Sequence, residues 1–308
     1  METTLTAQKL PVVFLVGATG QTGKLIIKEF DRNPGEVHLR LGLRSKSEIE
    51  RLRAEGRDAV YFDLDDPRTF GVALAGVDRL YLLTGYTIAM VTQSKTLVDA
   101  AKKAGVRHIV NQGVFAEWDC TDPHFSWFSL VERYIEASGI SWTHLHPNVF
   151  MEYLLASSPP VGGAFSVFWG EERAGWVALR DVAEVAAKVL REGPEKHGGR
   201  DYWMSTETHT GRQMADVLSV VLDRNVRCDV RSPEEFEALF TSGSIAVETW
   251  YARGAVDFCV QIADGRMGYI GNVKDEIPYL LGRPAITLRE WAAENREQLL
   301  EYIDHKEA

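Results

Sequence analysis

Short apolar runs alternate with amphipathic segments through the first half of this 308-residue chain. Runs of this length suit buried strands, and the spacing of apolar residues between them is typical of helices. The expected strands are Val12–Val16, Val37–Leu43, Ala59–Phe62, Arg79–Leu83, His108–Asn111 and Trp142–His146. The expected helices are Thr22–Arg32, Lys46–Glu55, Arg68–Leu74, Thr92–Lys103 and Phe128–Ala137. This alternation predicts an α/β fold, a doubly wound parallel sheet with helices on both faces.

The pattern changes after Met151. Residues 153–170 are rich in small residues, prolines and aromatics, which predicts a loop or lid. A further strand and helix are expected at Trp176–Ala178 and Asp181–Arg191, followed by a strand at Tyr202–Ser205. The remainder is expected to be mostly helical, because three segments begin with the capping-box spacing: Thr210 with Gln213, Ser232 with Glu235, and Thr287 with Glu290.

These elements predict two domains. Residues 1–155 are expected to form a nucleotide-binding Rossmann domain, to which residues 176–206 return. Residues 156–175 and 207–308 are expected to form a smaller, mostly helical substrate-binding domain against the edge of the sheet. The length of the chain suits roughly two domains.

A glycine-rich turn joins the first expected strand to the first expected helix. It runs from Gly17 to Gly23 and contains Thr19, Gly20, Gln21 and Thr22. In such a turn the first glycine allows a sharp bend, the second lets the backbone approach a pyrophosphate, and the third lets the helix pack closely. The helix N-terminus adds unpaired N–H groups and a partial positive charge. The turn therefore predicts a dinucleotide site, the alternative being a purely structural turn.

The end of the second expected strand bears on the choice of nucleotide. NAD sites often hold the ribose 2′-hydroxyl there with an acidic residue, but this chain has Arg44 and Lys46 instead. Both bases suit a 2′-phosphate, so NADP(H) is favoured over NAD(H); the alternative is that they simply begin a solvated helix. Asp63 and Leu64, after the third strand, are candidates for contact with the adenine, although Asp63 can equally cap a turn.

Composition narrows the range of partners. The net charge of −10 opposes binding to nucleic acid or anionic membranes, and no apolar stretch reaches the about 20 residues of a membrane helix. No signal peptide is visible, and the three cysteines form neither a zinc pattern nor a disulfide framework. His144 and His146 share one strand face but lack a third metal ligand. We expect a cytoplasmic protein without a metal that binds a small molecule, and oligomeric partners stay open.

Seven short motifs occur in a fixed order along the chain. They are Gly17–Gly23, Ala75–Asp78, Ala101–Val106, Ser138–Thr143, Pro147–Glu152, Asp181–Ala186 and Leu281–Pro284. In this order and spacing, nearly the whole chain resembles the NmrA-like group of atypical short-chain dehydrogenases/reductases. The resemblance implies a Rossmann domain with NAD(P) lying across the strand tips and a small C-terminal domain that closes over the nicotinamide.

The resemblance also implies three cofactor loops, each after a strand of the sheet. The loop beneath the nicotinamide ribose would be Thr84, Gly85 and Tyr86. Gln112 and Gly113 would lie beside the nicotinamide. Its carboxamide end would be covered by Pro147, Asn148 and Phe150. These loops follow the carboxyl ends of strands, where open α/β sheets bind ligands.

The departures from the family pattern concern the catalytic groups. Many short-chain dehydrogenases polarise a carbonyl with a Tyr-x-x-x-Lys pair on the helix after the fifth strand, together with a serine. That helix has no such pair here, and Asn111–Val114 contains no serine. The family's usual arginine before the proline after strand six is His146. We therefore expect a site without the alcohol–ketone dyad.

Hydride transfer without that dyad requires an acceptor that is already electron-poor, such as a quinone, iminium ion, conjugated enone or triaryl cation. His124 is the candidate for proton delivery because imidazole titrates near neutral pH; its alternative role is to cap a helix. Nearby aromatic residues suit a flat apolar ligand, although many aromatics are simply core. The candidate substrate-binding residues are Tyr86, His124, Trp127, Tyr153, Phe168, Trp169 and Trp250.

Two functions from different classes follow. The leading hypothesis is an NADPH-dependent reductase of an activated aromatic or conjugated small molecule. The alternative, implied by the same resemblance, is a non-catalytic regulator that senses oxidised or reduced nucleotide. The aromatic-rich segment and the two bases favour the enzyme, whereas the missing dyad favours the regulator.

Overall fold

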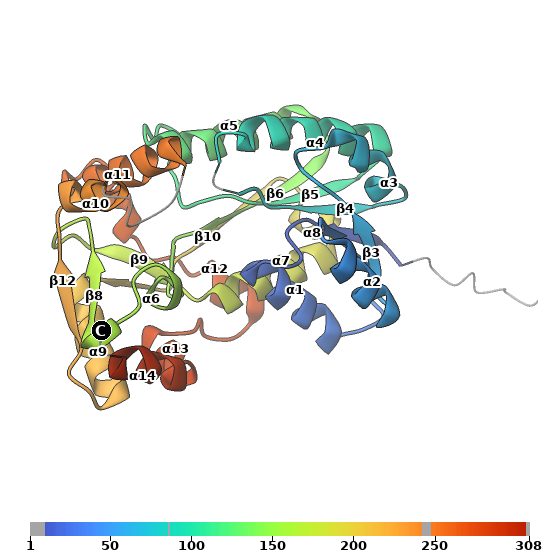
Figure 1. Ribbon diagram of the computed structural model, residues 1–308. Coiled ribbons are helices and arrows are strands. Elements are labelled where there is room, and N and C mark those ends of the chain that lie inside the picture. Colours follow the sequence, from blue (N-terminus) through green and yellow to red (C-terminus); the bar gives the residue numbers. More distant parts are fainter. Residues whose placement is uncertain (1–9, 86, 242–247, 306–308) are drawn as a thin grey trace, which may run out of the picture.

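The computed structural model describes residues 10–85, 87–241 and 248–305 (Figure 1). Within these residues, seven parallel strands form the central sheet in the order β10-β6-β5-β4-β1-β2-β3. The strands are β1 (Val12–Leu15), β2 (His38–Leu43), β3 (Asp58–Tyr61), β4 (Arg79–Leu82), β5 (His108–Gln112), β6 (Ser141–Pro147) and β10 (Arg200–Met204). The strand order reverses direction between β1 and β4, which confirms the predicted doubly wound sheet.

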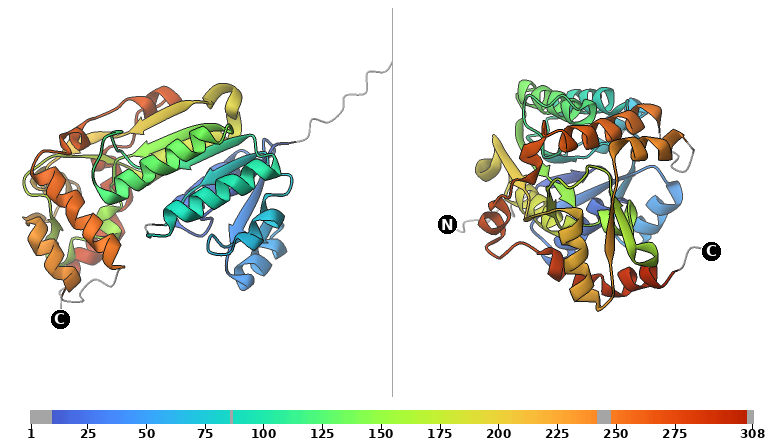
Figure 2. Two further views of the ribbon diagram at one scale, coloured as in Figure 1. Left: turned by 90° about the horizontal axis from the view of Figure 1, so that it is seen from above. Right: turned by 90° about the vertical axis from the view of Figure 1, so that its left-hand side faces the viewer.

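Helices cover both faces of this sheet (Figure 1, Figure 2). On one face lie α3 (Phe70–Leu74), α4 (Met90–Ala104) and α5 (Pro123–Ala137). On the other lie α1 (Gln21–Arg32), α2 (Lys46–Ala54), α7 (Leu179–Glu192) and α12 (Glu276–Leu281). Apolar side chains on the inner side of each helix, such as Ile26 and Leu97, are fully buried against the strands. The sheet therefore has a separate core on each face.

The remaining elements follow the carboxyl ends of β6 and β10. β7 (Val149–Phe150) comes directly after β6, β11 (Glu207–His209) after β10, and both pair with β9 (Ala174–Val177) in a small sheet. A second small sheet pairs β8 (Ala164–Val167) with β12 (Arg227–Val230). The helices of this part are α6 (Tyr153–Ala156), α9 (Gly211–Leu222), α10 (Pro233–Thr241), α11 (Thr249–Ala263), α13 (Leu288–Glu294) and α14 (Arg296–Asp304), and a short α8 (Pro194–His197) precedes β10.

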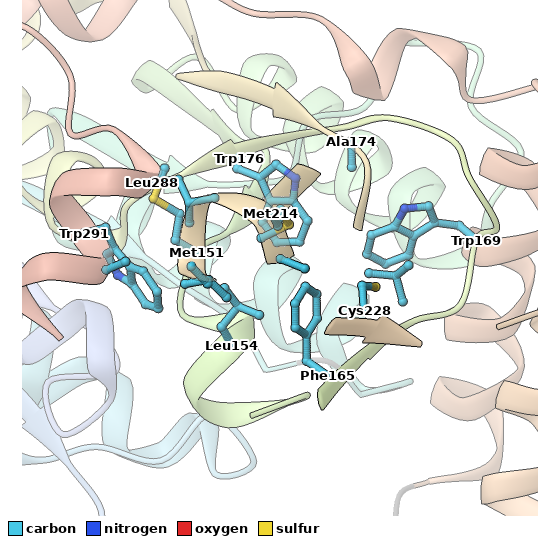
Figure 3. Close-up of a cluster of buried hydrophobic side chains, with 14 of the residues drawn as sticks. Met151, Leu154, Phe165, Trp169, Ala174, Trp176, Met214, Cys228, Leu288 and Trp291 are labelled. Atoms are coloured by element: carbon cyan, nitrogen blue, oxygen red, sulfur yellow. The ribbon is translucent and has the colours of Figure 1, made fainter. Parts of the chain in front are cut away.

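A third core lies between these small sheets and helices (Figure 3). Trp176 of β9 is fully buried, and Figure 3 shows it in one cluster with Met151 and Met214. Phe165 and Trp291 come from β8 and α13 and are almost fully buried in the same cluster. Aromatic side chains bury a large area each, so much of the aromatic content of this half serves packing.

The prediction that residues 153–170 form a loop or lid is wrong. This segment contains α6, a 3-10 turn at Val161–Gly163, and β8. In β8, Phe165 and Val167 are buried while the residues between them are half-buried, which is the alternation of a strand. The surrounding glycines and prolines conceal that alternation, and the partner strand β12 lies about 60 residues further along the chain.

The predicted helix caps are confirmed. Thr210 and Thr287 each accept a hydrogen bond from the N–H three residues on, in complete capping boxes. Ser232 does the same with Glu235, whose carboxylate accepts from the Ser232 N–H at 2.8 Å. α7 packs on the main sheet and β10 forms its edge, whereas β9 belongs to a small sheet; the two-domain division stays a prediction. Among the described helices, none is long and apolar enough to span a membrane.

Candidate active site

Three adjoining cavities extend outward from the carboxyl ends of the central strands. The first, the strand-tip cavity, has about 250 Å³ and is lined by Gln21, Thr22, Leu83, Thr84, Gln112, Gly113, Phe128, Phe150 and Leu179. The second, the aromatic cavity, has about 510 Å³ and shares Gln21, Gly113 and Phe150 with the first. The third, the outer cavity, has about 920 Å³ and lies beyond the aromatic cavity, with which it shares Tyr153 and Phe168 among others. A ligand that fills all three would reach from the sheet to β8 and β12.

The glycine-rich turn has the close packing that its sequence predicts. Gly17 has a φ of +74°, which favours glycine. A Cβ on Gly23 would overlap the Gly17 carbonyl oxygen and lie 2.9 Å from the Ala18 Cα, so α1 packs directly on the turn. The N-cap of α1 is Gly20, which has no side chain to accept from the N–H groups of the first turn. The turn therefore fits a pyrophosphate, since these N–H groups remain for an anion.

Arg44 and Lys46 are exposed just beyond the end of β2. Between them Ser45 caps α2 by accepting from the Glu48 N–H at 3.3 Å. The nearby Glu48 carboxylate pairs with Arg51 at 2.9 Å, and the hydrogen bond from Arg51 lowers the pKa of Glu48. Arg44 and Lys46 have no ion pair with any described residue. Both are therefore available to a phosphate, and their selectivity for NADP stays a prediction.

Of the residues predicted to contact the adenine and the ribose, some line a cavity and others lie in a turn. The Asp63 carboxylate accepts a hydrogen bond from the Asp65 N–H at 3.1 Å, so Asp63 does cap a turn. Leu64 is half-buried in that turn. Thr84 is buried and lines the strand-tip cavity, and Gly85 is exposed beside it. Tyr86 lies outside the described residues. Any contact of these residues with nucleotide remains a prediction.

A buried carboxyl group lies beneath the loop that follows β5. A Cβ on Gly113 would come within 2.5 Å of the Glu132 Oε1, so any larger residue there would displace this carboxyl group. Burial raises the pKa of Glu132 to about 7. His146 lies 3.5 Å from the same carboxyl, and its Nε2 is 2.9 Å from Asp201. Burial disfavours a charged His146, but the hydrogen bond to Asp201 and the nearby Glu132 outweigh this and raise its pKa.

The other implied nicotinamide residues have structural partners as well. Gln112 accepts a hydrogen bond from the buried Tyr81 hydroxyl. The Asn148 amide donates to the Ile270 carbonyl at 2.8 Å and to the Ser205 hydroxyl at 3.2 Å. These bonds tie the end of β6 to the end of β10 and to the 3-10 turn Gly268–Gly271. Pro147, Asn148 and Phe150 line the aromatic cavity.

The predicted aromatic residues divide into two groups. Tyr153, Phe168 and Trp169 line the aromatic cavity, and Phe168 and Trp169 are also almost fully buried, so they serve both cavity and core. Trp127 and Trp250 do not line any of the three cavities described. Trp250 is 54% exposed, with Arg253 over its ring. Sequence reasoning missed further lining residues, because neither a loop position nor a helix face distinguishes them in the sequence: Phe115, Phe125, Phe236 and Phe258.

His124 forms part of the wall of the aromatic cavity. It lies in the first turn of α5, where Asp122 acts as N-cap by accepting from the Phe125 N–H at 2.9 Å. The His124 ring is 5% exposed and packs 4.8 Å from the Tyr251 ring. A Cβ on Gly254 of α11 would lie 2.6 Å from its Cε1, so glycine gives the imidazole its space. Burial lowers the pKa of His124.

A Tyr-x-x-x-Lys spacing does occur at the C-terminal end of the chain, from Tyr302 to Lys306. The Tyr302 hydroxyl, on α14, donates to the Leu155 carbonyl at 3.1 Å. Tyr302 lines none of the three cavities described, and Lys306 lies outside the described residues. This spacing therefore does not supply a dyad at the strand tips.

A match over most of the chain decides the family. The model of the NmrA-like family fits residues 10–250. This chain belongs to the NmrA-like family. The resemblance found in the sequence motifs is thus confirmed.

Three proteins illustrate what this NmrA-like chain is similar to. The NAD(P)H azoreductase of Xenophilus azovorans is 28% identical over 291 residues, which cover 91% of this chain and 96% of the azoreductase. The NADPH-dependent quinone oxidoreductase QOR2 of Escherichia coli, solved with NADPH, has a TM-score of 0.79 and 24% identity over 92% of this chain and 99% of its own. Nmra, a negative transcriptional regulator solved with NAD, has a TM-score of 0.73 and 18% identity over 93% of this chain and 95% of its own. At these identities the two structures show a shared fold.

Proposed function

We propose that this protein is an NADPH-dependent reductase of activated aromatic or conjugated small molecules of the quinone, iminium or enone type. One observation carries the proposal. The strand-tip cavity, which the first turn of α1 borders, adjoins an apolar aromatic cavity, and the two share Gln21, Gly113 and Phe150. A nicotinamide at that junction would face an acceptor held by the aromatic walls. The azoreductase and quinone reductase among its relatives support the same chemistry.

The residues present fit a dinucleotide. The first turn of α1 would hold the pyrophosphate, and Arg44 with Lys46 would hold the 2′-phosphate of NADP(H). Thr84, Gln112 and Gly113 would border the nicotinamide ribose and ring. When bound, NADPH supplies a hydride, and the walls of the cavity keep water away from the reacting carbon.

The acceptor site would promote hydride transfer mainly by enclosing and orienting the acceptor, and less by protonating it with a strong acid. Its walls are mostly aromatic and aliphatic, with few polar groups, which suits a flat apolar ligand. A quinone that takes up a hydride needs one further proton to leave as a hydroquinone, because quinone, hydride and proton together make up the hydroquinone. His124 is the titratable group of this wall that we assign to proton delivery, drawing its proton from solvent.

Replacing His124 by alanine is expected to lower kcat with a quinone acceptor by about 100-fold, a proton-transfer loss at the lower end of the usual range. The Kd for NADPH is expected to change little, because His124 does not line the strand-tip cavity. Steady-state kinetics and equilibrium binding measure the two quantities. The matched variant His124→Gln keeps the side-chain volume and a polar tip but cannot shuttle protons. Full turnover in either variant would leave His124 with a packing role only.

The reductase activity itself is tested by NADPH oxidation with a naphthoquinone, an iminium alkaloid and a simple aliphatic ketone. We expect the first two to be reduced and the ketone to be a poor substrate, since α5 carries no Tyr-x-x-x-Lys pair to polarise its carbonyl. Tight nucleotide binding without reduction of any acceptor would contradict the proposal.

The second candidate is a nucleotide-sensing regulator of the NmrA type. The absent pair on α5 favours it, and the structural likeness to Nmra is consistent with it. Such a regulator would bind NAD(P) and transmit its redox state to a protein partner. Comparison of NADP⁺ and NADPH affinities separates the candidates: a regulator discriminates strongly between the two forms and turns over neither.

A further inference from the structure

The outer cavity has a charged wall made by the strand β12 and the residue after it. Arg227, Asp229 and Arg231 are two residues apart, so their side chains point to the same side of the extended chain. All three line the outer cavity. Cys228, between them, points the other way into the core, where Figure 3 shows it near Phe165. The charged face is thus fixed by the packing of the opposite face.

One of these positive charges is balanced and the other is not. Arg227 lies 3.3 Å from Asp229, which is the only carboxylate among the described residues that line this cavity. The Arg231 guanidinium has no hydrogen bond or ion pair with any described residue. The nearby Glu235 carboxylate is engaged by the Ser232 N–H at 2.8 Å. The outer cavity therefore carries an excess positive charge in a chain whose net charge is −10.

The position of Arg231 is set by its backbone. Its N–H donates to the Val167 carbonyl at 2.9 Å, and its carbonyl accepts from the Gly170 N–H at 3.4 Å. The side chain is half-buried, so part of its hydration is already lost. A half-buried, unpaired guanidinium is a strong recognition element for an anion because it presents several donors in a fixed plane.

The outer cavity continues the aromatic cavity. The two share Tyr153, Ser157, Phe168, Phe236 and Tyr251, which lie between them. The acidic side chain that lines the aromatic cavity, Glu152, is occupied by the Leu179 N–H and the Trp291 indole N–H. A ring system in the aromatic cavity would therefore extend a substituent toward Arg231 without passing an unpaired carboxylate.

We propose that Arg231 binds an anionic substituent, such as a sulfonate, carboxylate or phosphate, on the aromatic acceptor. This inference rests on the proposed function for its physiological meaning, but the anion site can be tested without turnover. With this anion site, the preferred substrate is an aromatic acceptor that carries its reducible group at one end and a negative charge at the other.

The test is equilibrium binding of a naphthalenesulfonate and of the neutral naphthol, followed by quenching of tryptophan fluorescence. Arg231→Met is expected to lower the affinity ratio of sulfonate to naphthol by about 10–100-fold, the usual value of a charge-assisted hydrogen bond. Arg231→Lys should recover part of that ratio. The matched charge control is Arg224→Met, on the exposed turn before β12 and outside all three cavities, which should leave the ratio unchanged.

The outcomes are distinguishable from those of the reductase proposal. An equal loss for both ligands in Arg231→Met, or the same change in Arg224→Met, would overturn the anion site. Binding selectivity that depends on Arg231 without NADPH oxidation would support the site and contradict the reductase. With an active enzyme, the specificity constant for a naphthoquinone monosulfonate relative to the parent naphthoquinone should fall in Arg231→Met by the same factor.

Discussion

Replacing both Arg44 and Lys46 by alanine is expected to weaken NADPH binding by about 100-fold or more and NADH binding by less than about 3-fold. Hydrogen bonds between charged partners contribute roughly 1.5–3 kcal/mol each, and two bases on one phosphate add up to a loss of this size. NADH has no 2′-phosphate and therefore loses little. Calorimetric titration of both nucleotides measures the difference.

The control for this prediction lies on the same helix. Arg51→Ala removes an exposed guanidinium of α2 that is already paired with Glu48 and Glu55. It should leave the ratio of NADPH to NADH affinity unchanged. Equal losses for both nucleotides in the double variant would mean that Arg44 and Lys46 only begin α2, and NADP selectivity would have to be abandoned.

A Gly23→Ala substitution is expected to abolish nucleotide binding, with an increase in Kd of more than about 100-fold. The new Cβ would overlap the Gly17 carbonyl oxygen and lie 2.9 Å from the Ala18 Cα, and both contacts are with backbone that cannot rotate away. α1 would therefore have to move off the turn that its N–H groups complete. Overpacking of this kind also costs about 1–3 kcal/mol of stability.

Gly71→Ala is the matched control for this substitution. Gly71 lies in α3 with ordinary helical backbone, and a Cβ there would meet nothing within 4 Å. The change should raise stability by up to about 1 kcal/mol, because alanine is the better helix former. Thermal unfolding and nucleotide titration are compared for both variants. Wild-type affinity in a folded Gly23→Ala protein would remove the turn from the pyrophosphate site.

The main sheet could be predicted from the sequence because each of its strands carries its own local signal. β1, β4 and β5 are buried along their whole length, as are the second half of β2 and most of β6, so they appear as apolar runs between polar segments. The small sheets carry no such signal. β12 alternates charged residues with Cys228 and Val230, and β8 is framed by glycines, so each becomes a strand only beside the other. Because these two strands are about 60 residues apart in the sequence, their pairing cannot be predicted from local pattern.

The candidate site divides in the same way. The glycine-rich turn and the two bases after β2 follow from local spacing, since their roles depend on neighbours along the chain. Local spacing does not reveal the other parts of the site. These are the Glu132 carboxyl beneath Gly113, the unpaired Arg231 and the phenylalanines of α10 and α11. A lone acid, base or aromatic in a helix has the same sequence pattern whether it faces solvent, core or cavity. Trp250 illustrates this, because the sequence predicted it for the pocket and the structure places it outside the three cavities, 54% exposed.

The place of β10 at the end of the main sheet matters during synthesis. β6 ends at Pro147, but its outer neighbour begins only at Arg200, after the chain has built α6, β8, β9 and α7. Until residue 204 has left the ribosome, β6 presents a row of unsatisfied N–H and C=O groups on one side. Such an edge is a template for pairing between nascent chains. A truncation that ends between β6 and β10 should therefore aggregate, even though it retains every residue of the glycine-rich turn.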